Sequence, residues 1–145
     1  MQNNTTTLEA SVAAFKVIAR DALRMNLISP RLSKITELEN EIKDTQECEA
    51  QNAHFKLVTE YELSVSDKNH PDYEDRKKES EEDIKASEEV TKQHADVVAA
   101  IEKEIADQKE GIEKIKSGET KVSLEALNEL TEKLIKQDAL NQVKS

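Results

Sequence analysis

The segment PDYEDRKKESEEDIKASEEVTKQHADVVAAIEKEIADQKEGIEKIKS, from Pro71 to Ser117, decides the fold. Alternating steps of four and three residues through it give one unbroken series. This spacing averages 3.5 residues and predicts a long helix that supercoils against a partner helix. The first half of the series is polar or small, and the second half is mostly Val and Ile. Its members are Tyr73, Lys77, Ser80, Ile84, Ser87, Thr91, His94, Val98, Ile101, Ile105, Gln108, Ile112 and Ile115.

A second long helix is predicted over about 30–65. Ser29-Pro30 is a specific helix start, because serine caps the first turn and proline at the first helical position needs no N–H partner. The polar segment 66–71 then separates this helix from the next, which is predicted over 71–117. The apolar positions that we expect on the inner face of the second helix are Leu32, Ile35, Leu38, Ile42, Ala50, Ala53, Leu57 and Tyr61.

Two shorter helices are predicted at the ends of the chain, over about 8–26 and 123–142. Ser117-Gly118 ends the preceding long helix, since glycine readily takes the left-handed conformation just past a helix. Ser123 is the expected N-cap of the last helix. The punctuation between segments therefore predicts four helices.

The lengths of these helices predict an all-α fold built on a long antiparallel two-helix hairpin. A short turn at about 66–71 makes the two long helices neighbours, which sets Ile42 near Val98 and Ile35 near Ile105. The short helices pack at the open end of the hairpin and form a four-helix base, so that residues 1–145 are one helical domain. The predicted core seam is Ile35, Leu38, Ile42, Val98, Ile101, Ile105 and Ile112. In the base we also expect burial of Phe15, Ile18, Leu23, Leu32, Leu127, Leu130 and Leu134.

The composition limits both partners and location. With 31 acidic and 21 basic residues the net charge is −10, which opposes direct binding to nucleic acid or to anionic membranes. Neither a run of about 18 apolar residues nor a secretory signal is visible. Cys48 is the only cysteine, so no intrachain disulfide can form. We expect a protein that is not secreted and lies in the cytoplasm or within a macromolecular assembly such as a virion.

No residue pattern points to catalysis, to a metal or to a cofactor. His54, His70 and His94 lack the Glu-x-x-His and His-x-x-x-His spacings of metal-binding helices, and His94 is expected on the seam as a partly buried residue that sets register. Cys48 lies between two glutamates, which disfavour its thiolate. We therefore predict a non-enzymatic protein.

The most prominent surface feature is an acidic run at the start of the third predicted helix. We interpret it either as a solvated helix face with i,i+4 ion pairs such as Glu74–Lys78 and Glu81–Lys85, or as a docking surface for a basic partner. Its carboxylates are Asp72, Glu74, Asp75, Glu79, Glu81, Glu82, Asp83, Glu88 and Glu89.

Three functions fit this profile. The first is a structural or assembly subunit, such as a scaffold, an adaptor or a virion component, which acts through coiled-coil contacts as a homo-oligomer or within a larger complex. The second is an acidic regulatory binder or inhibitor of a basic, even DNA-binding, protein through the hairpin tip. The third is a small chaperone with Phe15, Leu23 and Met25 as client contacts.

Overall fold

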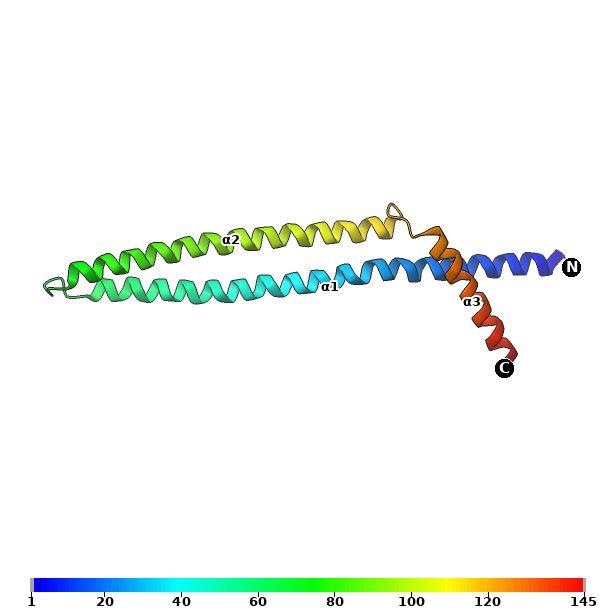
Figure 1. Cartoon of the computed structure of the whole chain (residues 1–145), viewed down its shortest axis with the longest axis horizontal. Helices are drawn as coiled ribbons and strands as arrows, with labels where there is room; N and C mark the ends of the chain where they lie inside the picture. The colour runs from blue at the N-terminus through cyan, green and yellow to red at the C-terminus, as the bar shows by residue number, and fades with distance from the viewer. Residues whose placement is uncertain (1, 145) are drawn as a thin grey trace. The chain divides into compact units, whose positions relative to one another are not determined.

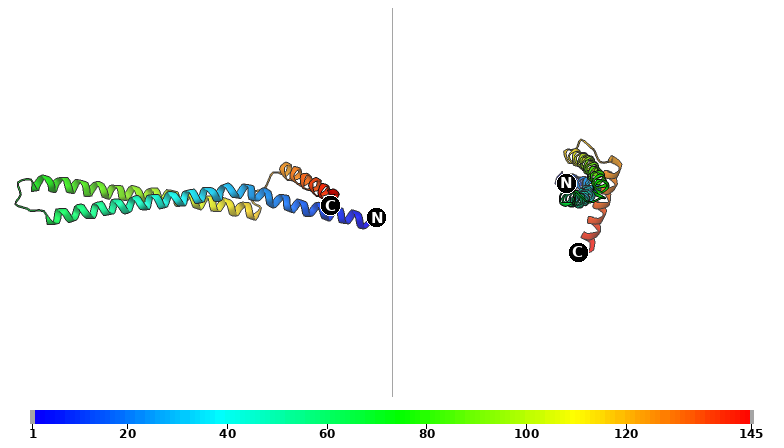
Figure 2. Two further views of the ribbon diagram at one scale, coloured as in Figure 1. Left: turned by 90° about the horizontal axis from the view of Figure 1, so that it is seen from below. Right: turned by 90° about the vertical axis from the view of Figure 1, so that its left-hand side faces the viewer.

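The regular secondary structure of the described part of the chain is all helical and consists of three α-helices (Figures 1 and 2). The computed structural model describes the backbone of residues 2–144 and the side chains of residues 10–143. Helix α1 spans Gln2–Val65, α2 spans Tyr73–Ser117 and α3 spans Leu124–Lys144. None of the described helices holds a segment long and apolar enough to cross a membrane.

The prediction of two helices over 8–26 and 30–65 is wrong, because α1 continues through Pro30. Proline inside a helix removes one backbone hydrogen bond and costs about 3 kcal/mol. Burial on both sides of the proline opposes this cost, since Ile28 and Leu38 retain only 5% and 1% of their exposure. The local start signal at Ser29-Pro30 is thus outweighed by packing, and the base contains segments of three helices rather than four.

The ends of the other helices follow their predicted signals closely. Helix α2 begins at Tyr73 rather than at Pro71, because the carbonyl of Asp72 accepts the first helical bond, from the Arg76 N–H. Gly118 has a φ of 83° and ends α2 as expected. The hydroxyl of Ser123 accepts a bond from the Ala126 N–H, which confirms Ser123 as the N-cap of α3.

The chain divides into two compact units, and α1 and α2 each contribute to both. Unit 1 comprises Met1–Lys34 and Gln108–Ser145, and unit 2 comprises Ile35–Asp107. In unit 1, the buried apolar residues come from all three helices. They are Ala19, Ile28, Ile112, Ile115 and Leu127, whereas Phe15, Leu23, Leu130 and Leu134 are half-buried.

Two residues expected in the core of the base do not lie there. Ile18 is 53% exposed and Leu32 is 48% exposed. Ala19 is fully buried, and the predicted Phe15 and Leu23 are half-buried, so the inner face of α1 is narrower than predicted and excludes Ile18. Since each residue advances a helix by about 100°, a shift of one position is enough to exchange an inner residue for an outer one.

Unit 2 is an antiparallel hairpin of α1 and α2 (Figure 1). Asn52 lies opposite Ser87, and Glu49 lies opposite Thr91 and His94. This is the register predicted by folding the chain within 66–71. At the end of unit 2 away from the turn, the core consists of Ile35, Leu38, Ile101 and Ile105, all at most 9% exposed, with Ile42 and Val98 half-buried.

The inner seam of α1 in unit 2 keeps a strict alternation of three and four residues. Beyond Ile42 this alternation places mostly polar side chains on the inner seam. One of them, Thr59, is buried, with only 8% of its surface exposed. The inner positions are Ile35, Leu38, Ile42, Thr45, Glu49, Asn52, Lys56, Thr59 and Leu63, all buried or half-buried. On α2 the predicted seam is inner throughout, except that Val90 replaces the exposed Thr91.

The prediction of the inner residues of α1 beyond Ile42 is wrong, because the helix keeps the alternation of three and four residues. Leu57 is 65% exposed and Tyr61 is 66% exposed, and Ala50 and Ala53 are exposed as well. Reaching them from Ile42 would require two successive steps of four, which is a local break in the 3.5-residue period. The helix keeps its period, so this apolar stripe, offset by one residue, faces away from α2.

Replacing Pro30 with alanine tests the continuity of α1. Because Pro30 lies inside a helix, Pro30→Ala should raise the free energy of unfolding by up to about 3 kcal/mol, as it restores a helical donor. Thermal and urea unfolding followed by circular dichroism measure this. Pro71→Ala, in the turn between α1 and α2, is the control and should change stability little. A Pro30→Ala protein that is less stable than the wild type would instead support a helix start at Ser29-Pro30.

Candidate functional site: polar contacts between the two helices of the hairpin

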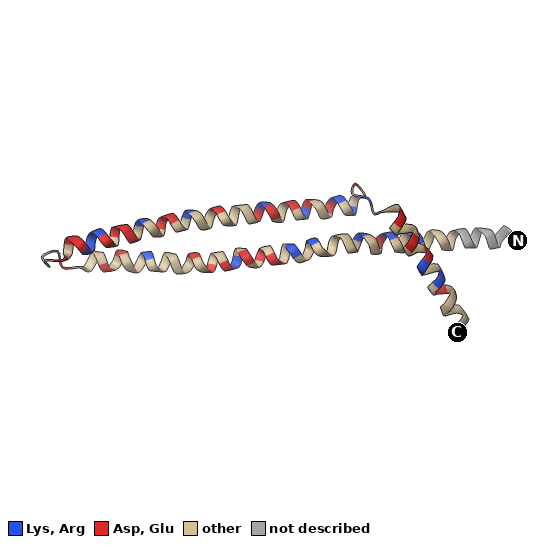
Figure 3. Cartoon of the chain, viewed as in Figure 1, with Lys and Arg blue, Asp and Glu red and all other residues tan. Residues whose placement is uncertain are grey.

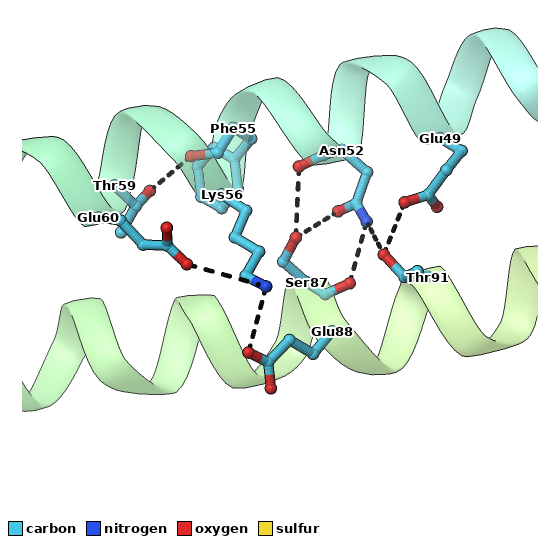
Figure 4. A network of polar contacts seen from close by, with 9 residues as sticks. All are labelled: Glu49, Asn52, Phe55, Lys56, Thr59, Glu60, Ser87, Glu88 and Thr91. Atoms are coloured by element: carbon cyan, nitrogen blue, oxygen red, sulfur yellow. Dashed lines mark hydrogen bonds and ion pairs between the residues drawn. The ribbon is translucent and has the colours of Figure 1, made fainter.

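The middle of unit 2 holds a network of polar side chains between α1 and α2 (Figure 4). The Ser87 hydroxyl, 3% exposed, donates to Asn52 Oδ1 at 2.8 Å. In return, Asn52 Nδ2 donates to the Ser87 carbonyl at 2.9 Å and to Thr91 Oγ1 at 3.1 Å. These reciprocal bonds satisfy both side chains, so the pair tolerates burial at an inner position of the hairpin.

Glu49 extends this network along α1. One carboxylate oxygen accepts the Thr91 hydroxyl at 2.6 Å, and the other lies 2.5 Å from His94 Nδ1. The Thr91 hydroxyl, the His94 ring and Asn52 favour the charged carboxylate, and together they hold the pKa of Glu49 below its ordinary value. Since Thr91 and His94 lie on α2, the negative charge of Glu49 links the two helices.

A shallow groove lies beside Glu49 and His94. Its walls come from α1 and α2, and most of its surface is apolar owing to Ala95, Val98 and Ala99. A carboxylate that orients a histidine is part of many nucleophilic active sites, where a serine or cysteine supplies the attacking atom. Neither residue lines this groove, and the Thr45 hydroxyl donates to the Glu41 carbonyl. The contacts of Glu49 with Thr91 and His94 join α1 to α2, and His94 is half-buried at the seam position predicted from the sequence.

The remaining histidines and the cysteine lie apart from this network. His54 and Cys48 are exposed on α1. His70 lies in the turn, as expected, where its ring Nδ1 accepts a bond from the Asp72 N–H at 3.1 Å. Among the described side chains, no group of three or more His, Cys, Asp or Glu residues is arranged to hold a metal ion.

The predicted acidic surface is present at the start of α2 (Figure 3). All nine carboxylate residues are exposed except Asp83, which is half-buried. The expected pairs Glu74–Lys78 and Glu81–Lys85 are not among the ion pairs that the described side chains form. Glu88 instead pairs across the hairpin with Lys56 at 3.3 Å. Asp75, Glu79 and Glu82 recur at steps of four and three, so they share one outward face of α2.

A basic pocket in unit 1 was not predicted from the sequence. Arg20 and Arg24 come from consecutive turns of α1, and Lys121 comes from the connection between α2 and α3. Val122 and Leu127 form its apolar part. A local signal exists, because residues 10–34 carry five basic residues against Asp21 alone, but only the fold adds Lys121.

Comparisons with known proteins do not assign the chain to a group. No family model, no curated protein and no solved structure matches it. The function must therefore be inferred from the physical properties of the two units.

The Asn52–Ser87 pair yields a prediction for stability. Ser87→Ala should destabilise the hairpin by about 1–3 kcal/mol, because it leaves Asn52 Oδ1 without its donor at an inner position. Ser80→Ala, at a half-buried inner position of the same helix where no side-chain hydrogen bond forms, is the matched control and should cost less. Urea unfolding measures both. Equal effects of the two substitutions would show that the Asn52–Ser87 bond contributes nothing.

Glu49 yields a prediction for pH dependence. Its lowered pKa means that its contribution to stability is present above the ordinary glutamate pKa and is lost as the pH falls through the lower, folded-state value. We expect the melting temperature to fall on acidification through this range, and Glu49→Gln should make that fall smaller. Glu47→Gln, which removes the same charge from an exposed position two residues away, should leave the pH profile as in the wild type. Identical profiles for the Glu49→Gln and wild-type proteins would contradict this role.

Proposed function

We propose that this protein is a non-enzymatic structural or assembly subunit that works through helix–helix contacts with other protein chains. The observation that carries the proposal is the distribution of polar and apolar side chains on α1 in the hairpin of unit 2. Beyond Ile42, mostly polar side chains occupy the inner seam of α1, while Leu57, Tyr61 and Val65 are 65%, 66% and 62% exposed on its outer face. Large apolar side chains gathered on one exposed face are typical of surfaces that another protein covers.

Helical spacing supports this interpretation. Leu57, Tyr61 and Val65 follow one another at steps of four, so they form a continuous stripe on α1, and Val58 widens it. A helix that lies along this stripe would bury side chains that each contribute about 1.5–3 kcal/mol. The polar part of the inner seam of α1, beyond Ile42, contributes little apolar burial of its own. Stability of unit 2 is thus expected to increase when a partner covers the outer face.

The proposal places the protein in the cytoplasm or within the assembly that it helps to build. Ile101 and Ile105 are 9% and 8% exposed inside unit 2, so a charge at these positions would test folding rather than association. The outer stripe of α1 is the surface through which association can be tested separately from folding.

A second candidate function is an acidic binder of a basic protein partner. Asp75, Glu79 and Glu82 share an outward face of α2, and none of them forms an ion pair with another described side chain. Their desolvation on binding would therefore break no existing ion pair. Such a surface steers a basic partner by charge.

Replacing the outer stripe tests the assembly proposal. In Leu57→Gln/Tyr61→Gln, both side chains are already exposed in the single chain, so the helical content should stay the same. Association should weaken by roughly tenfold or more per side chain, since about 1.4 kcal/mol corresponds to a factor of ten. Sedimentation velocity over a range of micromolar concentrations measures this.

Phe55→Gln is the control for this experiment. Phe55 is 50% exposed on the same helix, but it lies two residues before Leu57 and so about 200° around the helix axis. It should leave association unchanged. Hydrogen exchange of α1 in a dilute, unassociated protein provides the decisive result. If the backbone amides around Leu57, Tyr61 and Val65 are as protected as those of the buried core, no partner is needed to cover the stripe and the proposal is wrong.

A further inference from the structure

The two units of the chain have opposite net charges. Unit 2, Ile35–Asp107, contains 22 acidic and nine basic residues, whereas unit 1 contains nine acidic and twelve basic residues, which together account for the totals of 31 and 21. A net charge of −10 for the whole chain therefore conceals a basic unit. Opposite charge on two parts of one chain allows copies of that chain to attract one another.

The basic charge of unit 1 converges at the pocket lined by Arg20, Arg24 and Lys121. No acidic residue lines this pocket, and none of its three cations forms an ion pair with a described side chain. Its volume is about 450 Å³, which is the scale of a site for several side chains rather than for a single ion. Leu124 at its rim is 68% exposed. The pocket is thus a cationic site with an apolar margin, and no described acidic side chain pairs with its cations.

The acidic face of α2 has the matching chemistry and spacing. Asp75 and Glu79 are separated by four residues, as are Arg20 and Arg24, so both pairs span about 6 Å along their helices. Guanidinium groups bind carboxylates through two parallel hydrogen bonds, which gives such pairs both strength and orientation. Glu82 lies one further turn along the same face and is available to Lys121.

We propose that the pocket of unit 1 binds the acidic face of α2, formed by Asp75, Glu79 and Glu82, of a second copy of the chain. This inference rests on the proposed assembly function and names its partner and its contact. The contact is heterologous, because a pocket on one copy meets a helix face on another. Each copy can therefore both donate an acidic face and accept one, which permits a closed ring or an extended chain of copies.

Charge reversal on either side of this contact should abolish it. Arg20→Glu/Arg24→Glu and Glu79→Lys/Glu82→Lys are each expected to weaken self-association by about a hundredfold or more, because attraction becomes repulsion. The wild-type association should also weaken at least about tenfold when salt rises from roughly 0.05 M to 0.5 M, since screening shortens the range of charge interactions. Sedimentation velocity measures all three, with circular dichroism to confirm that each variant is folded.

Two control variants carry the same charge changes at other exposed positions of the same units. Lys109→Glu/Lys133→Glu alters unit 1 outside the pocket, and Glu102→Lys/Glu104→Lys alters α2 away from the acidic face. Both should associate within a few-fold of the wild type. An effect equal to that of the pocket variants would show that net charge alone drives association, and the proposed contact would be wrong.

The decisive experiment combines the two reversals. A chain with all four substitutions has an acidic pocket and a basic face, and it should associate about as well as the wild type. A mixture of the two separate reversal variants should likewise form mixed oligomers. If both reversals abolish association and neither combination restores it, the pocket and the acidic face do not contact each other, and the proposed contact is wrong.

Substitutions in the outer apolar stripe distinguish a failure of the pocket contact from a failure of the assembly proposal. Association that ignores salt and charge reversal but is lost in Leu57→Gln/Tyr61→Gln would overturn the pocket contact and leave the assembly function standing. A wild-type protein that stays monomeric at low salt would also overturn the pocket contact. Hydrogen exchange of α1 would then be the remaining test of the proposed assembly function.

Discussion

The period of the inner seam is the constraint on which the rest of unit 2 depends. Ile35 and Leu38 on α1 pack with Ile101 and Ile105 on α2, and their burial determines which side of each helix faces the other. From there a helix without a break can only continue at steps of three and four. Every inner residue as far as Leu63 follows from that starting point, whatever its polarity.

This constraint explains why α1, beyond Ile42, has mostly polar residues on its inner face and large apolar residues on its outer face. An inner position that falls on Glu49 or Asn52 must find hydrogen-bond partners, and Thr91, His94 and Ser87 on α2 supply them. The same geometry leaves Leu57 and Tyr61 on the outer face. The polar contacts between α1 and α2 and the exposed apolar stripe therefore have one cause. Polar inner contacts favour one register, while the apolar outer face is suited to association.

The division of charge adds a second level of organisation. Acidic residues accumulate in unit 2 and basic residues in unit 1, so each unit has a different set of suitable partners. Apolar side chains provide most of the free energy of protein association, and charges select the partner and the orientation. The outer apolar stripe of unit 2 and the cationic pocket of unit 1 are the two surfaces on which the proposed assembly depends.

The sequence by itself determined the helical class, the turn between α1 and α2, the end of α2 at Gly118 and the cap at Ser123. Each depends on a local signal, such as a proline, a glycine or a hydroxyl next to a free N–H group. The seam of α2 was also predictable, because its Val and Ile residues recur at steps of three and four without a competing pattern.

Only the tertiary structure decided the path of α1 and the inner face of its second half. The start signal at Ser29-Pro30 is local, and burial of Ile28 and Leu38 on either side outweighs it. Beyond Ile42 the sequence offers two stripes that differ by one residue, one polar and one apolar. Hydrophobicity favours the apolar stripe, but the unbroken period from the buried end selects the polar one. The basic pocket likewise required the fold, since Arg20 and Lys121 are a hundred residues apart and only packing of α1 beside the connection to α3 brings them together.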